Sequence, residues 1–256
     1  MHILPFWETT GKAMSEKERI LIADDSAMNR AILTEMLGDG YEILEAEDGR
    51  QAVSILQTDA SVDLLLLDIM MPNMDGFDVL TMMNKYHWID EIPVIMISAE
   101  NASSFVERAY DLGATDYISR PFDMAVVRRR VINTLMLYAK QKLVLEAKAA
   151  KVQALDSGTL FLGELDYMAK DSAFSRRTGF DGRSIKDVAQ ADVVNAAFSP
   201  TKEEIDWANM IIGAYEKAVE RGESDLFVND RFIDPPVIMK AKNILARDAM
   251  IQARAK

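Results

Sequence analysis

Five short apolar runs, separated by segments of helix length, constrain the fold of this chain more than any other feature of its sequence. Each run holds four or five residues, and the runs cover 20–23, 41–44, 63–67, 93–97 and 116–119. Continuous apolar strands that alternate with amphipathic helices are typical of a parallel sheet covered by helices on both faces. Over residues 19–137 the sequence therefore predicts an α/β fold, a doubly wound sheet of five parallel strands.

The segments between these runs carry the start and stop signals of helices. Ser26 is a suitable N-cap for a helix that ends at Gly38, and Asp48 precedes a second helix. A third helix is expected after the turn at 72–75, and a fourth ends at Gly113. With the helix that follows the last run, these segments complete five βα units.

Polar side chains follow the apolar runs directly. Asp24 and Asp25 follow the first run, Asp68 the third, Ser98 the fourth and Arg120 the fifth. Because sites in such sheets lie at the carboxyl ends of the strands, we expect three carboxylates to converge there. Crowded carboxylates are unfavourable without a cation, and Mg²⁺ prefers oxygen ligands, so the pattern predicts a Mg²⁺ site. The alternative is that these aspartates only cap the helices that follow the strands.

Charge and composition bear on several other classes of function. Nearly all of the net charge of −12 lies in residues 14–140, and residues 141–256 are close to neutral. An acidic domain repels a phosphate backbone and a near-neutral remainder lacks a basic stripe, so we expect no direct binding to nucleic acid. No apolar run approaches the ~20 residues of a membrane span. We therefore expect no membrane segment.

The chain has no cysteine, which excludes disulfides and is compatible with the cytoplasmic location that we expect. Residues 1–13 have neither the basic region nor the apolar core of a signal peptide. Met14 is a candidate for the start of the domain proper. Residues 1–16 are accordingly expected to form an N-terminal extension.

Several motifs in the first half resemble the receiver domain of two-component response regulators, over about residues 17–138. They are ILIADDSAMNR, LLLLDIMMPNMDGFDVL, PVIMISAE and GATDYISRPF. The resemblance implies a flavodoxin-like fold and a Mg²⁺-dependent phosphorylation by a histidine kinase or phosphotransfer protein. It makes Asp68 the phosphoacceptor, and it makes Asp24, Asp25, Asp68 and the backbone carbonyl of Met70 the metal ligands.

The same resemblance assigns roles around the phosphoryl group. Ser98 would donate its hydroxyl to a phosphoryl oxygen, and Tyr117 would turn toward the space that Ser98 vacates. Ala99 is small, which would leave the phosphoryl group accessible, and Glu100 and Met70 are placed to influence its hydrolysis.

One position departs from the pattern of the family. Receivers usually carry Lys where this chain has Arg120, directly before Pro121. A planar guanidinium does not reproduce the reach of a compact ammonium. We expect phosphorylation to persist, with altered rates and weaker switching.

A long helix without Gly or Pro is predicted over 123–155, and residues 139–158 are expected to be a helical linker. Apolar residues recur along it at spacings of four and three, at Val131, Leu135, Tyr138, Leu145, Ala149 and Val152, with Lys142 interrupting the seam. Such a seam favours either a short dimeric coiled coil or a helix packed on its own domain.

Residues 159–256 are expected to form a separate C-terminal segment, largely helical. The patterns predict a strand at 158–165, a helix over 166–179 and a helix that ends at Gly222, with a capping box between Thr201 and Glu204. A hairpin is expected to turn on Asn229 and Asp230, followed by a last helix capped by Asp234 with Pro235 in its first turn.

About residues 160–250 resemble the C-terminal end of the citrate lyase β-subunit and malyl-CoA lyase-like (HpcH/HpaI aldolase) family. The stretches that carry this resemblance are GFDGRSIKDVAQADVVNAAFSPTKEEIDWANMII and DLFVNDRFIDPPVIMKAKNILAR. Asp187-Val188 replaces the His-Pro of that family, and the barrel strands with its catalytic residues are missing, so we expect no lyase activity. Asp234 would match a carboxylate of those lyases, and its alternative role is that of a helix cap.

Two classes of function follow from the sequence. The first is a phosphorylation-controlled response regulator, which is no enzyme beyond its own phosphorylation and dephosphorylation, with the C-terminal segment as an output or oligomerisation element. A homodimer through the extended helix or the C-terminal segment belongs to this class. The second is a carbon–carbon lyase under receiver control, and a trimmed chain or a fusion of two pieces joined near residue 155 would also explain the sequence.

Overall fold

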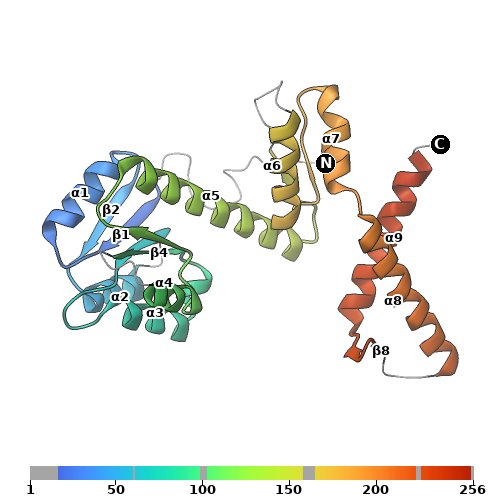
Figure 1. Ribbon diagram of the computed structural model, residues 1–256, viewed down its shortest axis with the longest axis horizontal. Coiled ribbons are helices and arrows are strands. Elements are labelled where there is room, and N and C mark those ends of the chain that lie inside the picture. The colour runs from blue at the N-terminus through green and yellow to red at the C-terminus, as the bar shows by residue number, and fades with distance from the viewer. Residues whose placement is uncertain (1–16, 60, 99–102, 158–164, 223–225, 255–256) are drawn as a thin grey trace. The chain divides into compact units, whose positions relative to one another are not determined.

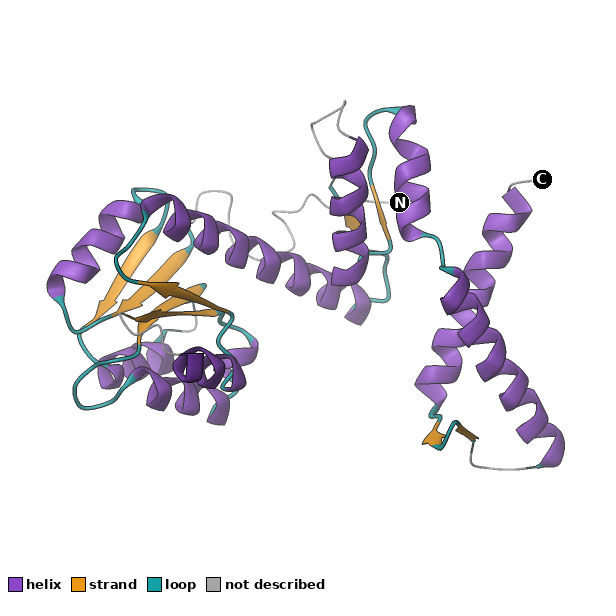
Figure 2. Cartoon of the chain, viewed as in Figure 1, coloured by secondary structure: helices purple, strands orange, loops and turns teal. Residues whose placement is uncertain are grey.

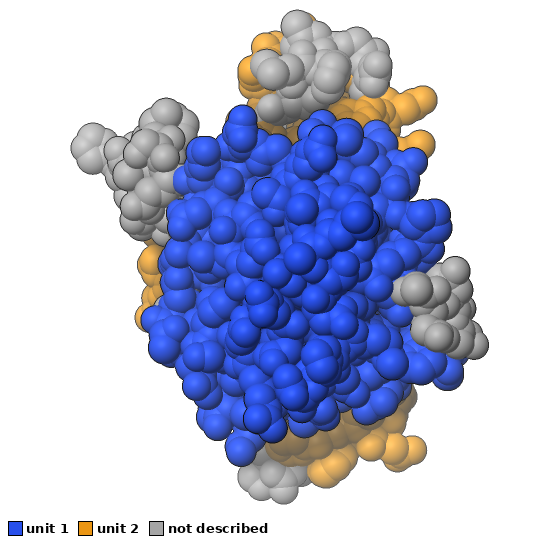
Figure 3. All heavy atoms as spheres, turned by 90° about the vertical axis from the view of Figure 1, so that its left-hand side faces the viewer, with its two compact units in different colours: residues 1–146 blue, residues 147–256 orange. Residues whose placement is uncertain are grey.

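The computed structural model describes residues 17–59, 61–98, 103–157, 165–222 and 226–254. The chain divides into two compact units, with the boundary between Glu146 and Ala147 (Figure 3). The boundary falls within the helix that was predicted as a linker. Each unit is described by itself below.

The first unit is built on one parallel sheet of five strands (Figures 1 and 2). The strands are β1 (Arg19–Ala23), β2 (Glu42–Ala46), β3 (Leu64–Asp68), β4 (Val94–Ser98) and β5 (Asp116–Ser119). Their order across the sheet is β2-β1-β3-β4-β5, so the winding reverses between β1 and β3. The predicted doubly wound α/β fold is confirmed.

Helices cover both faces of this sheet, as Figure 1 shows. They are α1 (Ala27–Leu37), α2 (Gly49–Thr58), α3 (Gly76–Lys85), α4 (Ser103–Asp111) and α5 (Met124–Ala149), with a short 3₁₀ turn η2 (Trp88–Asp90). Residues of α1 and α5 pack on one face, and residues of α2, α3 and α4 pack on the other. All residues of β3 and β4 are buried, which explains their uninterrupted apolar sequences.

The predicted helix starts agree with the structure. Ser26 caps α1 and Asp48 caps α2, and each side chain accepts a hydrogen bond from a backbone N–H of the first turn. Asp75 caps α3 in the same way. Gly38 ends α1 with φ of 73°, a left-handed conformation that glycine adopts without strain.

The prediction of one helix over 123–155 is wrong at its C-terminal end. Helix α5 ends at Ala149, where Lys151 takes a positive φ of 56° and the Val152 N–H bonds back to the Ala147 carbonyl. The chain then turns into a strand at Leu155. The pairing of that strand with a distant segment determines where α5 ends. The helical periodicity of the sequence cannot reveal such a pairing.

The predicted seam of α5 is not one continuous exposed face. Val131 and Leu135 are buried in the core of the first unit, whereas Leu145 is 69% exposed. The first half of the seam is therefore the side of the helix that packs on its own domain. Only the later part of it remains open to another partner.

Among the residues that the structure describes, the second unit contains the end of α5 and four further helices. They are α6 (Leu165–Thr178), α7 (Ala191–Phe198), α8 (Lys202–Arg221) and α9 (Pro235–Arg254), with a 3₁₀ turn η3 (Val188–Gln190) before α7. A parallel pair, β6 (Leu155–Asp156) and β7 (Gly182–Arg183), and an antiparallel pair, β8 (Phe227–Val228) and β9 (Arg231–Phe232), complete it. The sequence patterns anticipated neither α7 nor the β6–β7 pair.

Helices α8 and α9 lie side by side and form a small core in which Ala208, Ile211 and Ala241 are buried (Figure 1). The capping box of Thr201 and Glu204 is present, and Gly222 ends α8 in the left-handed conformation. The hairpin turns on Asn229 and Asp230, as predicted, and both take positive φ.

The strand predicted over 158–165 falls largely outside the described residues, and its last residue, Leu165, belongs to helix α6, so that residue corrects the prediction. The apolar residue at the end of the predicted strand thus belongs to the first turn of α6. None of the helices that the structure describes has a stretch long and apolar enough to cross a membrane.

Candidate functional site

Three carboxylates meet at the carboxyl edge of the sheet, at the point where its winding reverses. Asp24 and Asp25 follow β1, and Asp68 ends β3, the neighbouring strand. One oxygen of each of the three lies within 4.8 Å of the others. Asp24 and Asp68 are buried and Asp25 is exposed, so the cluster is open on one side.

Asp24 is held in place by the helix that follows it. Its carboxylate accepts hydrogen bonds from the backbone N–H of Ser26 at 2.9 Å and from Asn29 Nδ2 at 3.1 and 3.2 Å. Arg30, whose side chain is 8% exposed, donates to the Asp24 carbonyl at 2.8 Å and pairs with Glu45 at 2.7 Å. Asn29 and Arg30 were not identified from the sequence, although they lie on the first turns of a helix that begins beside the site.

Arg120 contacts two of these carboxylates, and no other cationic side chain of the described residues does so. It follows β5, and its Nη2 lies 2.5 Å from Asp24 Oδ2 and 3.0 Å from Asp68 Oδ2. Burial by itself would lower the pKa of Arg120, but the hydrogen bonds and charges of Asp68 and Asp24 raise it, so the guanidinium stays charged.

Asp68 is buried, with 1% of its surface exposed, and only one of its oxygens is held by Arg120. Burial raises the pKa of the Asp68 carboxyl, and Arg120 offsets part of this effect. The other oxygen, Oδ1, has no hydrogen-bond donor among the described residues. A buried carboxylate oxygen without a donor, beside two further carboxylates, fits a hard divalent cation such as Mg²⁺.

Gly76 allows the chain to pass beneath Asp68. A Cβ at this position would lie 2.3 Å from the Asp68 carbonyl oxygen, well inside van der Waals contact. The Gly76 N–H also donates to the Ile69 carbonyl at 2.9 Å. From the sequence this residue is only the first position after the predicted turn at 72–75, and no local pattern indicates its close approach to the site.

The other predicted residues surround this cluster. Ser98 ends β4 and is 1% exposed, and its carbonyl accepts the Arg120 N–H at 2.9 Å. Met70, two residues beyond Asp68, has a side chain that is 62% exposed. Ala99 and Glu100 lie outside the described residues, and nothing follows for the roles assigned to them.

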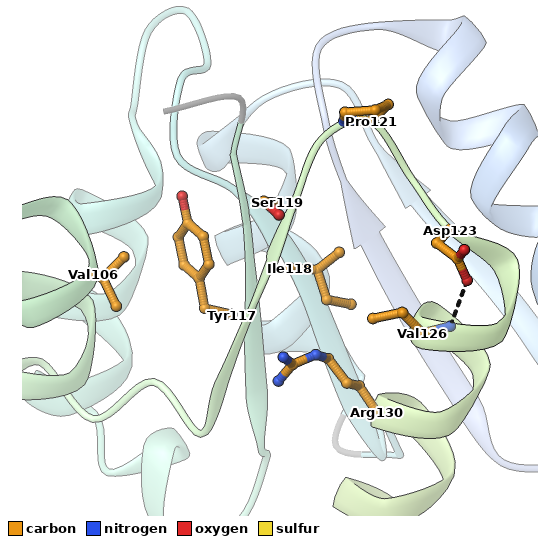
Figure 4. A pocket seen from close by; sticks show the side chains of 8 residues that line it. All are labelled: Val106, Tyr117, Ile118, Ser119, Pro121, Asp123, Val126 and Arg130. Atoms are coloured by element: carbon orange, nitrogen blue, oxygen red, sulfur yellow. Dashed lines mark hydrogen bonds between the residues drawn. The ribbon is translucent and has the colours of Figure 1, made fainter. Parts of the chain in front are cut away.

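Tyr117 stands on β5 at the edge of a cavity of about 340 Å³ between β5, α4 and α5. In Figure 4 its ring lies beside Val106 of α4. Arg130 of α5 lines the same cavity and forms an ion pair with Asp116. The half-buried ring therefore lies next to space that its side chain can enter.

Asp234, the candidate from the lyase resemblance, lies in the second unit and acts as a helix cap. Its Oδ1 accepts the backbone N–H of Val237 at 3.1 Å in the first turn of α9. This contact matches the alternative role given to it from the sequence.

Comparison with known proteins agrees with this geometry. The family model of the response regulator receiver domain matches residues 20–132. The chain is 32% identical to the two-component response regulator ORR3 of Oryza sativa subsp. indica over 126 residues. This alignment covers 47% of this chain and 96% of ORR3. The chain therefore belongs to the response regulator receiver family through this part of its length.

Some relatives extend beyond the part that they share with this chain. The transcriptional regulatory protein CpxR of Klebsiella pneumoniae is 38% identical over 132 residues, which are 50% of this chain and 55% of that protein. The chain thus spans about half the length of this relative. Among solved structures, the chemotaxis protein CheY4 of Vibrio cholerae aligns with a TM-score of 0.44 and 27% identity, over 46% of this chain and 98% of CheY4.

The match of the family model ends at residue 132. The resemblance of residues 160–250 to the citrate lyase and malyl-CoA lyase-like family stays a prediction. The acidic cluster and the family agree with the predicted use of Mg²⁺, because receiver domains generally bind this ion.

Proposed function

We propose that this chain is a two-component response regulator in which Asp68 accepts a phosphoryl group from a histidine kinase or a phosphotransfer protein, with Mg²⁺. The phosphorylation would switch residues 159–256, which would act as an output or oligomerisation element. The observation that supports this most is the state of Asp68. It is a buried carboxylate with one oxygen held by Arg120 and the other without a donor among the described residues.

The chemistry needs a nucleophile and compensation for negative charge. An oxygen of Asp68 would bond to phosphorus while the bond from phosphorus to the donor imidazole nitrogen breaks, and that nitrogen keeps the electron pair. Arg120, 3.0 Å from Asp68, would balance the charge of the phosphoryl oxygens. Mg²⁺ held by Asp24, Asp25, Asp68 and the Met70 carbonyl would supply further positive charge.

The switch would use Ser98 and Tyr117. The Ser98 hydroxyl, buried at the end of β4, would donate to a phosphoryl oxygen. Tyr117, whose ring now lines the cavity of about 340 Å³ between β5, α4 and α5, would then turn inward. The surface formed by α4, β5 and α5 would change, which is a two-state response to an added charge.

Phosphorylation is tested by incubating the full chain with acetyl phosphate and Mg²⁺ and weighing the intact protein by mass spectrometry. We expect one phosphoryl group on the parent chain, and none with Asp68→Asn or after chelation of the metal. Asp78→Asn, which alters an exposed carboxylate on α3, is the matched control and should be modified like the parent. Equal modification of the Asp68→Asn variant would contradict the proposal.

The output is tested by light scattering with Mg²⁺, with and without beryllofluoride as a phosphoryl mimic. A change of mass that is lost in Asp68→Ala would mean that the receiver controls self-assembly, through the exposed end of α5 or the C-terminal segment. An unchanged mass with the mimic bound would mean that another protein reads the activated surface, and a pull-down with the phosphorylated form would follow.

Beyond phosphorylation and dephosphorylation of Asp68 we propose no enzymatic activity, and we place the chain in the cytoplasm. We also propose that the chain binds neither nucleic acid nor a membrane directly. The alternative, a receiver-controlled acyl-CoA lyase, rests on the resemblance of residues 160–250. Cleavage of malyl-CoA or citramalyl-CoA by the purified chain would overturn our ranking of the two.

A further inference from the structure

The second unit holds a cavity of about 640 Å³ that belongs to none of the features described above. Side chains from the end of α5, from α6 and α7, from the first turn of α8 and from much of α9 line it, together with two residues of the connecting segments. Its volume is within the range of about 300–1,000 Å³ that is typical of sites for small molecules.

Cationic side chains outnumber carboxylates around this cavity. The lining includes Lys148, Arg176, Lys240 and Arg247, against only Asp181 and Glu204. Two of the cations are already paired, because Lys148 lies 2.7 Å from Asp181 and Arg176 lies 2.5 Å from Glu204. The site is thus left with a surplus of positive charge.

The surplus comes from Lys240 and Arg247 of helix α9. No carboxylate of the described residues lies within ion-pair distance of either side chain. Arg247 donates to the backbone carbonyl of Asp181 at 2.7 Å, which orients its guanidinium without neutralising it. Lys240 Nζ lies 5.8 Å from the centre of the Trp207 ring. Because the two residues are seven apart on one helix, they lie on the same face, two turns from each other.

The rest of the lining is largely apolar. It consists of Phe198, Pro200, Pro236, Met239 and Ile244, with Asn243 beside them. Met239 is 59% exposed, so its side chain is accessible from the solvent. The site thus combines an apolar wall with two cations that form no ion pair in the described part of the chain. The charge of Lys240 also acts on the Glu204 carboxylate, which Arg176 already holds.

We infer that this cavity binds a small organic anion that has an apolar portion, with the anionic head against Lys240 and Arg247 and the apolar portion against Met239 and Phe198. The head is a carboxylate or a phosphate, both of which accept hydrogen bonds from a guanidinium and an ammonium. The inference goes beyond the proposed phosphorylation and does not depend on it.

The test uses the full chain labelled with [¹³C-methyl]methionine and observed by NMR, with Met239→Leu to assign the Met239 signal. Octanoate is the probe, acetate has its head without the tail, and 1-octanol has the tail without the charge. We expect octanoate to shift the Met239 signal saturably at concentrations at which acetate and 1-octanol leave it in place. Octyl phosphate in a parallel titration shows which head binds more tightly.

Variants decide whether the charge is responsible. Lys240→Gln removes a cation that makes no hydrogen bond to a described residue, and we expect it to weaken octanoate binding about fivefold. Adding Arg247→Gln should weaken it about fivefold again. Lys217→Gln, an exposed lysine of α8 outside the cavity, is the matched control and should bind like the parent.

Three results would overturn the inference. They are the absence of a saturable shift at Met239, an equal shift with 1-octanol, and unchanged octanoate binding by Lys240→Gln. Circular dichroism of each variant must match the parent. If the Arg247 variant fails this requirement, Lys240→Gln by itself still decides the question, since the Lys240 side chain lies over Trp207 and forms no ion pair with a described residue.

Discussion

Nη2 of Arg120 lies 3.0 Å from Oδ2 of Asp68, so one nitrogen joins the residue after β5 to the end of β3. The same nitrogen also contacts Asp24. A guanidinium presents several donors in one plane, whereas an ammonium is a compact charge on a flexible stem. A lysine at position 120 would present its charge on a compact, non-planar group, and we expect it to hold the two carboxylates in a different geometry.

We expect Arg120→Lys to change the rate of phosphorylation by acetyl phosphate, or of the following dephosphorylation, by about threefold or more. The reason is that phosphoryl transfer depends mainly on positioning and on charge compensation. Both rates are measured by intact mass spectrometry at fixed Mg²⁺ concentration. Identical rates for the two proteins would show that the departure from the family has no effect on the chemistry.

Asp68→Asn should stabilise the first unit at neutral pH, and the effect should appear as a higher melting temperature. Burial raises the pKa of Asp68, so folding favours its protonated form and the charged form costs stability. This cost shrinks as the pH falls toward the raised pKa, and the advantage of the variant should shrink with it.

Calorimetry of the full chain between about pH 7 and pH 4 measures this difference. Glu107→Gln, at an exposed position of α4, serves as the control and should change the melting temperature little. A lower melting temperature for Asp68→Asn at neutral pH would mean that its pairing with Arg120 outweighs the cost of burial.

Gly76→Ala should destabilise the first unit by about 2 kcal/mol, the usual cost of forcing an atom into a filled space. The new Cβ would lie 2.3 Å from the Asp68 carbonyl, so the backbone that carries the phosphoacceptor must shift, and slower phosphorylation should accompany the loss. Gly40→Ala is the matched control, since nothing lies within 4 Å of its Cβ. Normal stability and phosphorylation of Gly76→Ala would contradict the structure at this turn.

The second unit should lose stability in acid through Glu204. Partial burial raises the pKa of Glu204. The Thr201 backbone N–H, the Arg176 guanidinium and the charge of Lys240 together lower it by more, so the net shift is downward. A lowered pKa means that the stabilisation is present above the ordinary pKa of a glutamate and is lost as the pH falls below it.

Glu204→Gln should therefore be less stable than the parent near neutral pH and should approach it in acid. Thr201→Ala, which removes the other half of the capping box, should cost about 1 kcal/mol. Thermal unfolding followed by circular dichroism between about pH 7 and pH 3 tests both variants. A constant difference between Glu204→Gln and the parent over this range would exclude the ionised carboxylate as the cause.

Much of the first unit was predictable because its signals are local. Apolar runs predicted the strands β1 to β5 within two residues, and Ser26 and Asp48 marked helix starts by the chemistry of their own side chains. The convergence of Asp24, Asp25 and Asp68 followed from strand ends that share one edge of a parallel sheet.

The sequence by itself thus determined the class of fold, the caps and the residues at the carboxyl edge, because periodicity and capping act over a few neighbouring residues. Only the tertiary structure decided that Arg120 reaches both Asp24 and Asp68 and that Gly76 passes beneath Asp68. It also decided that α5 ends before β6 pairs with β7, and that Lys240 and Arg247 face a cavity. Each of these depends on contacts between residues far apart in the chain, whose geometry no local pattern encodes.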